Sequence, residues 1–116
     1  MKIKPLYLRS LAVIPLERED FLLQLERAIA FFASLYGRCG MRDPNAASEI
    51  EPISSAPLSI DGECAVNELW SEALLLYMEY LCKGERDAYT RALSAADGAY
   101  RSLWRVRAAG RRLRPR

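Results

Sequence analysis

Apolar residues recur with helical spacing along three long segments of the chain. In the first, residues 16–36, they keep 4-3-4-3 spacing, while Gln24, Glu26 and Arg27 mark the opposite face. The apolar positions are Phe21, Leu25, Ala28, Phe32 and Leu35, joined by Leu22, Ile29 and Tyr36. Acidic residues near the start and Gly37 at the end supply start and stop signals. The pattern predicts a helix whose broad apolar face needs a partner.

The second segment, from Asp61 or Gly62 to about Cys82, is apolar around most of the helical circumference. Its charged positions form one narrow stripe of Glu68, Glu72 and Glu79. A helix with so little polar surface is expected in the middle of the structure.

The third helix is predicted from Glu85 to Ala109, where Ala92, Ala95 and Ala99 lie beside the apolar positions with 4-3-4-3 spacing. Those positions are Tyr89, Leu93, Ala96, Tyr100 and Leu103. Small residues allow a close helix approach, and the short Lys83-Gly84 break predicts an antiparallel hairpin with the second helix.

The remaining segments carry weaker patterns. Residues 2–14 fit either a short strand or a short helix, which we expect to dock on the bundle. Residues 38–64 contain three prolines and no apolar period, which indicates either a flexible surface excursion or a binding loop. Within that stretch, Asp43-Pro44 could begin a short helix through Ile50.

These elements predict an all-α fold, a small three-helix bundle with an antiparallel C-terminal helical hairpin and one N-terminal helix. We expect a single domain over residues 1–116, with an irregular loop at 38–64 and a basic extension at 110–116. The second helix has only two long partners, so the N-terminal segment or a second molecule must complete its coverage. We therefore expect a homodimer or a complex with another helical protein.

Charge divides the chain unequally. Residues 1–97 hold ten Lys and Arg against fifteen Asp and Glu, whereas residues 98–116 hold seven arginines and no acid. Such asymmetry indicates contact with a partner. The candidate binding residues at this end are Arg101, Trp104, Arg105, Arg107, Arg111, Arg112, Arg114 and Arg116.

The same arginines also have plainer explanations. They could stabilise a helix C-terminus, keep the protein soluble or fold against the chain's own acidic surface. As an external partner, an acidic protein, a like-charged assembly contact or nucleic acid would each suit them. Arginines can neutralise phosphates, and the interleaved Tyr100 and Trp104 could stack on exposed bases or under a guanidinium.

The residue types of the chain give little support for catalysis or metal binding. Histidine is absent, no phosphate-binding glycine loop occurs, and Cys39, Cys64 and Cys82 show no metal-ligand spacing. We expect reduced cysteines, with a Cys39–Cys64 disulfide as the minor alternative and Cys82 as a small core residue. Neither a cofactor nor a metal is expected, and no membrane span, so we expect a cytoplasmic protein.

Two functions are consistent with these observations, and no motif assigns a family. The first is a non-enzymatic protein–protein interaction module: an adaptor, a small subunit or a chaperone-like helical protein that self-associates. The alternative is a nucleic-acid-binding accessory protein that uses the arginine-rich end. An acid/base enzyme built on Glu68 and Glu72 is a third hypothesis, set against the simpler view that their stripe faces water.

Overall fold

The computed structural model describes residues 1–42 and 58–112, without the side chains of residues 38, 39 and 106–112. The described residues form an all-α fold, as predicted. Its helices are α1 (Ile3–Ser10), α2 (Arg18–Tyr36), α3 (Arg38–Met41), the short 3₁₀ helix η1 (Glu68–Trp70), α4 (Ser71–Lys83) and α5 (Arg86–Arg112). The expected count of three helices is therefore incomplete, because α1 and the two short helices join the three long ones.

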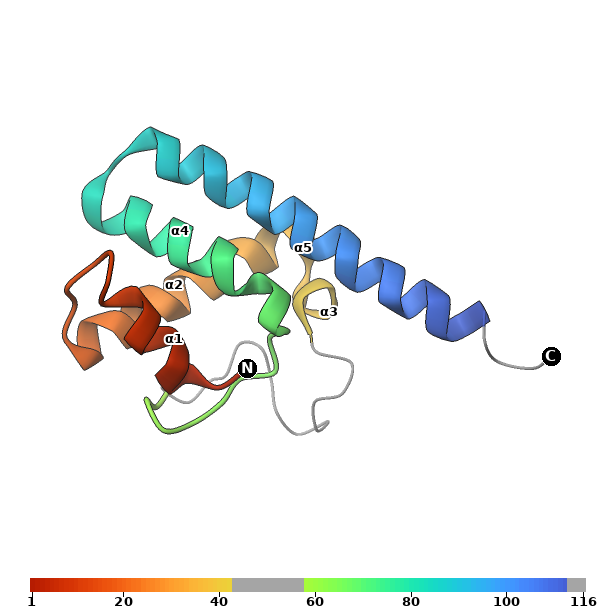
Figure 1. Ribbon diagram of the computed structural model, residues 1–116, viewed down its shortest axis with the longest axis horizontal. Coiled ribbons are helices and arrows are strands. Elements are labelled where there is room, and N and C mark those ends of the chain that lie inside the picture. The colour runs from red at the N-terminus through yellow and green to blue at the C-terminus, as the bar shows by residue number, and fades with distance from the viewer. Residues whose placement is uncertain (43–57, 113–116) are drawn as a thin grey trace.

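Helix α4 lies at the centre of the molecule, as its nearly continuous apolar surface predicts. It contacts α5, α2 and α1, and Ala73, Leu74, Leu76 and Met78 are buried among them. Figure 1 shows α4 and α5 as an antiparallel hairpin, with α2 crossing behind it. Gly84 makes the turn, since its backbone is left-handed (φ 71°) and its N–H donates to the Tyr80 carbonyl at 2.7 Å.

Helix α5 packs on α4 through a stripe of small residues. Ala88, Ala92, Ala96, Ala99 and Leu103 are buried, whereas the larger side chains beside them are only half-buried. The alanines thus allow the close approach that the sequence predicts, while the tyrosines lie at the edges of the contact.

Aromatic rings fill the space between α2, α4 and α5. Phe31 stacks on Tyr77 with ring centroids 4.3 Å apart, and Phe32 packs against Trp70 at 5.6 Å. Phe32 and Trp70 are fully buried, so these rings form the middle of the core. Burial also raises the pKa of the half-buried Tyr77.

The N-terminal segment, predicted as either a short strand or a short helix, forms helix α1. Ile3 and Leu6 are buried in the shared core, so the expected docking is confirmed. The docking uses backbone pairing: the Ile3 N–H donates to the Gly62 carbonyl at 3.2 Å, and the Cys64 N–H donates to the Met1 carbonyl at 3.0 Å. The Met1 ammonium also donates to the Cys64 carbonyl at 2.7 Å.

The same pairing corrects the predicted start of the second helix. Residues 62–66 are not helical: Glu63 bridges Lys2, and Val66 bridges Arg42. Helical structure therefore begins only at Glu68. Asn67 caps this start, because its side chain accepts the Leu69 N–H at 3.0 Å. Tertiary pairing outweighs the apolar helical pattern here.

Three further expectations are corrected at residue level. Leu35 is 55% exposed, although its spacing placed it on the apolar face of α2. Cys82 is exposed rather than in the core, because it lies in the last turn of α4 just before the chain turns at Gly84. Helix α5 continues to Arg112, three residues beyond its predicted end at Ala109.

The predicted loop at 38–64 is only partly described. Its first residues form α3, with Met41 fully buried, and its last residues place Ile60 and Cys64 in the core. The Leu58 N–H donates to the Glu26 carboxylate at 3.1 Å, which holds the returning chain against α2. The short helix expected from Asp43 to Ile50 lies outside the described residues.

Candidate functional site

A groove runs along the seam between α1 and the η1–α4 segment. Its larger part is a cleft of about 370 Å³, and a second cleft of about 210 Å³ shares Arg9 with it. We call the two clefts together the α1–α4 groove. Its lining includes Arg9, Ser10, Val13 and Ile14 on one side, Glu68, Ser71, Glu72, Leu75, Leu76 and Glu79 on the other, and Arg91 from α5.

The floor and one rim of this groove are apolar. Ile14 and Leu76 are buried at its base, and Val13 is 46% exposed on its wall. Leu11, 42% exposed, lies two residues before Val13 in the turn that follows α1. Neighbouring exposed apolar side chains beside a cleft are a feature of surfaces that bind other proteins.

The other wall carries the acidic stripe that the sequence predicts. Glu68 lines the smaller cleft, and Glu72 and Glu79 line the larger one. Glu72 and Glu68 are exposed and Glu79 is half-buried. The stripe thus faces solvent along a groove, rather than on a featureless side of the bundle.

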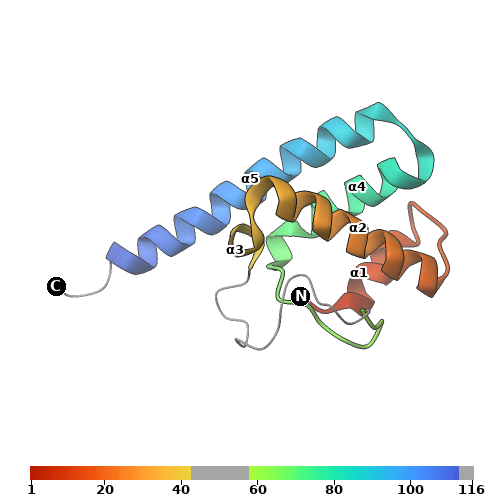
Figure 2. The ribbon, with the colours of Figure 1, turned by 180° about the vertical axis from the view of Figure 1, so that it is seen from behind.

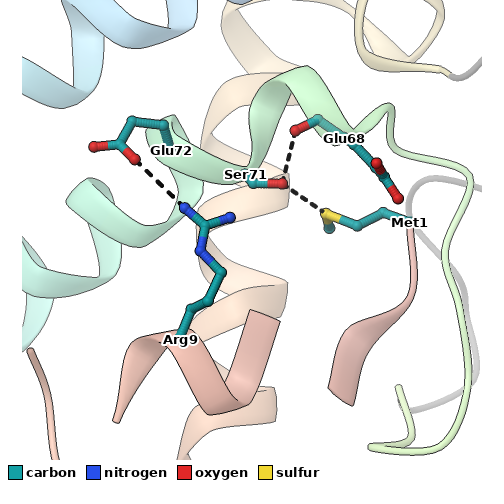
Figure 3. A network of polar contacts seen from close by, with 5 residues as sticks. All are labelled: Met1, Arg9, Glu68, Ser71 and Glu72. Carbon is teal, nitrogen blue, oxygen red and sulfur yellow. Dashed lines mark hydrogen bonds and ion pairs between the residues drawn. The ribbon is translucent and has the colours of Figure 1, made fainter. Parts of the chain in front are cut away.

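Two polar contacts cross between the walls of the groove, Arg9–Glu72 and Ser71–Met1 (Figure 3). The Arg9 Nη2 lies 3.6 Å from the Glu72 Oε2. The Ser71 hydroxyl donates to the Glu68 carbonyl at 2.7 Å and lies 3.6 Å from the Met1 sulfur. Glu79 pairs with Lys83 at 3.6 Å, away from α1. Exposed ion pairs of this kind contribute about 0–1 kcal/mol, so a partner can exchange them at little cost.

This geometry bears on the acid/base hypothesis. A carboxylate that exchanges protons near neutral pH needs a desolvated position or a close like charge. Glu72 is exposed and pairs with an arginine, and Glu68 is exposed. Among the described residues, no group of three or more acidic or cysteine side chains could hold a metal ion.

The arginine-rich candidates lie on the second half of α5, away from the groove of the same chain. Figures 1 and 2 show this half of α5 projecting past the rest of the bundle. We call residues 101–112 the α5 arm. Arg101 and Arg105 are exposed, and the Arg101 Nε pairs with Asp97 at 3.1 Å. Trp104 is 52% exposed between them.

The other predicted arginines are placed only by the backbone. Arg107, Arg111 and Arg112 occupy helical positions of α5, whereas Arg114 and Arg116 lie outside the described residues. The structure thus brings Arg101, Trp104 and Arg105 together on adjacent turns of one helix. About two further turns of α5 follow, and they also contain arginines.

The sequence does not predict the groove, because its walls come from segments that are some sixty residues apart. One signal was present: an acidic stripe on an otherwise apolar helix, together with an unassigned apolar segment that carries Arg9. Oppositely charged partners on the two segments could have suggested that they lie side by side.

Comparison with protein families, with curated proteins and with solved structures finds no match for this chain. In the part of the chain that the structure describes, no helix is both long enough and apolar enough to cross a membrane.

Proposed function

We propose that this protein is a non-enzymatic protein–protein interaction module, and that its α1–α4 groove receives an amphipathic helix with basic side chains. The observation that carries the proposal is the acidic stripe of Glu68, Glu72 and Glu79 along a groove with an apolar floor. A helix in such a groove contributes apolar anchors to the floor and charged residues to the rim.

The dimensions of the groove suit one helix and a weak interaction. Glu79 lies eleven positions after Glu68, a length of about 16 Å or three turns of helix. A contact of three turns buries less surface than a standard interface, so we expect a weak and readily reversible interaction. An adaptor, a small subunit or a cytoplasmic chaperone that releases its client would use such an affinity.

The test is a pair of synthetic helical peptides that differ only in charge. One carries arginine at i, i+4 and i+11 on an alanine-rich helix with leucines on one face, and the other carries glutamate at the same positions. We expect the arginine peptide to shift the NMR signals of Val13, Leu75 and Leu76 in a saturable manner. The glutamate peptide should leave those signals unchanged.

A matched pair of variants locates the binding. Glu72→Gln should weaken binding of the arginine peptide about threefold, because it removes one exposed ion pair. Glu85→Gln removes an exposed acid at the connection between α4 and α5 and should change nothing. Equal binding of the two peptides, or signal changes confined to other surfaces, would contradict the proposal.

The α5 arm supports nucleic-acid binding as a second candidate function. Residues 98–116 contain seven arginines and no acid, and exposed Trp104 lies between exposed Arg101 and Arg105. Arginines can neutralise phosphates while an aromatic ring stacks on a base. The test is anisotropy of a labelled single-stranded oligonucleotide: affinity should fall steeply with salt, and deleting residues 109–116 should reduce that slope.

A further inference from the structure

We infer that the helix received by the α1–α4 groove is the α5 arm of a second copy of this chain. This inference rests on the proposed function, since it names the partner of the same groove. It follows from matched spacing, from the direction of the helices and from the position of the arm.

The charges of the groove and of the arm repeat at the same intervals. Glu68, Glu72 and Glu79 are separated by four and seven residues, and so are Arg101, Arg105 and Arg112. Each set occupies one face by its helical register, over a length of about 16 Å. If the two helices run in the same direction, each arginine position meets one glutamate.

An arm cannot reach the groove of its own chain. Helix α5 runs antiparallel to α4 and continues unbroken from Arg86 to Arg112, so its arm extends beyond η1 into the space outside the bundle (Figure 1). Folding back onto α4 would require a break in α5. The partner of the groove therefore has to come from another molecule.

A two-fold axis perpendicular to α5 supplies the required direction. Under this symmetry the α5 helices of the two copies are antiparallel, so the arm of one copy runs parallel to α4 of the other. Residues equally distant from Gly84 lie opposite each other in the hairpin, which places Glu68 across from about Tyr100. An axis near Tyr100 then brings all three charge pairs into register at once and closes the dimer.

Positively charged groups also line the groove and weaken the contact: Lys2 lines the smaller cleft with Glu68, and Arg9 and Arg91 line the larger one. Arg9 pairs with Glu72, and Arg91 lies at the α5 side, where it is 3.9 Å from Asp87. An incoming arginine must displace Arg9, so the net electrostatic gain is modest and should weaken with salt. The same register places exposed Trp104 level with Ser71, at the smaller cleft, as an apolar anchor.

The experiment measures self-association of the full chain by sedimentation equilibrium from 5 to 500 μM. We expect a monomer–dimer equilibrium that weakens as NaCl rises from 50 to 500 mM. Glu72→Arg and Arg105→Glu should each weaken dimerisation about tenfold, because each places like charges at both symmetric contacts. The controls Glu85→Arg and Arg27→Glu change net charge equally at exposed positions outside the groove and the arm, and should leave dimerisation unchanged.

The decisive sample is an equimolar mixture of the Glu72→Arg and Arg105→Glu chains. In a mixed dimer, one contact has the original pair and the other has the swapped pair, so association should return to near the wild-type value. Circular dichroism of each variant shows whether it is folded.

Three results would overturn the inference: a monomer at 500 μM, equal weakening by the control variants, or a mixture that associates no better than its components. These outcomes are separable from failure of the proposed function. A groove that binds the arginine peptide in a chain that stays monomeric would retain the interaction module and reject the second copy as its partner.

Discussion

Replacing Ile3 with alanine tests whether α1 is part of the core and so whether the groove has a fixed wall. The Ile3 side chain is fully buried, and its backbone N–H pairs with the Gly62 carbonyl. Ile3→Ala removes three buried carbons, which lowers the free energy of unfolding by about 2.4 kcal/mol at about 0.8 kcal/mol per carbon. A cavity that does not collapse adds up to about 2 kcal/mol, so we expect a loss of roughly 2.5–4 kcal/mol.

Urea unfolding followed by tryptophan fluorescence measures this loss, because Trp70 lies in the same buried cluster. Hydrogen exchange of the Ile3 and Cys64 amides shows whether α1 detaches first, since both amides donate in the pairing of the two segments. Leu8→Ala on the same helix is the control: Leu8 is 58% exposed, so the expected change is within about 0.5 kcal/mol.

A loss below about 1 kcal/mol for Ile3→Ala, or equal losses for the two variants, would refute the reasoning. It would mean that α1 rests on the surface without contributing to the core. The groove would then lack one wall in solution.

The remaining predictions concern two glycines and two thiols. Gly84→Ala should lower stability by about 1 kcal/mol because φ is 71° there, whereas Gly98→Ala should raise it by about 0.5–1 kcal/mol because a methyl group meets no atom within 4 Å. Thermal melts measure both, and shifts of the same sign would contradict this account. A thiol reagent should modify exposed Cys82 long before buried Cys64, and equal rates in the native protein would argue against the burial of Cys64. Burial raises the pKa of Cys64 above its ordinary value of 9.0, so its contribution to stability is complete below pH 9 and declines as pH rises through the folded-state pKa. The urea midpoint should therefore fall less steeply above pH 9 in Cys64→Ala than in the wild type.

Local patterns predict the parts of the fold that depend on local interactions. The end of α2 at Gly37, the turn at Gly84 and the alanine stripe of α5 all follow from residue type and spacing. Their physical causes act within a few residues: glycine adopts the left-handed backbone, and alanine permits close helix packing. The central position of α4 follows from its apolar circumference in the same way.

Long-range pairing accounts for what the sequence does not predict. Residues 62–67 lie in the segment predicted as a helix, yet they are not helical, because Met1, Ile3 and Met41 supply backbone partners from elsewhere in the chain. The spacing of apolar residues along α2 also cannot show how far the helices packed against it extend. For this reason it does not predict that Leu35 is exposed. For the candidate site, the composition of the chain identified the arginine-rich end. The groove could not be predicted in this way, because it depends on how α1 packs against α4.

The backbone pairing of residues 1–3 with residues 62–64 has a consequence for the order of folding during synthesis. The Met1 ammonium and the Cys64 carbonyl are 63 residues apart along the chain. At about 5–20 residues per second, a ribosome needs roughly 3–13 seconds to make that interval, during which Ile3 and Leu6 have no completed core to enter. Helix α1 is therefore synthesised well before the segment that it pairs with, and it can reach its place only after that segment has been made.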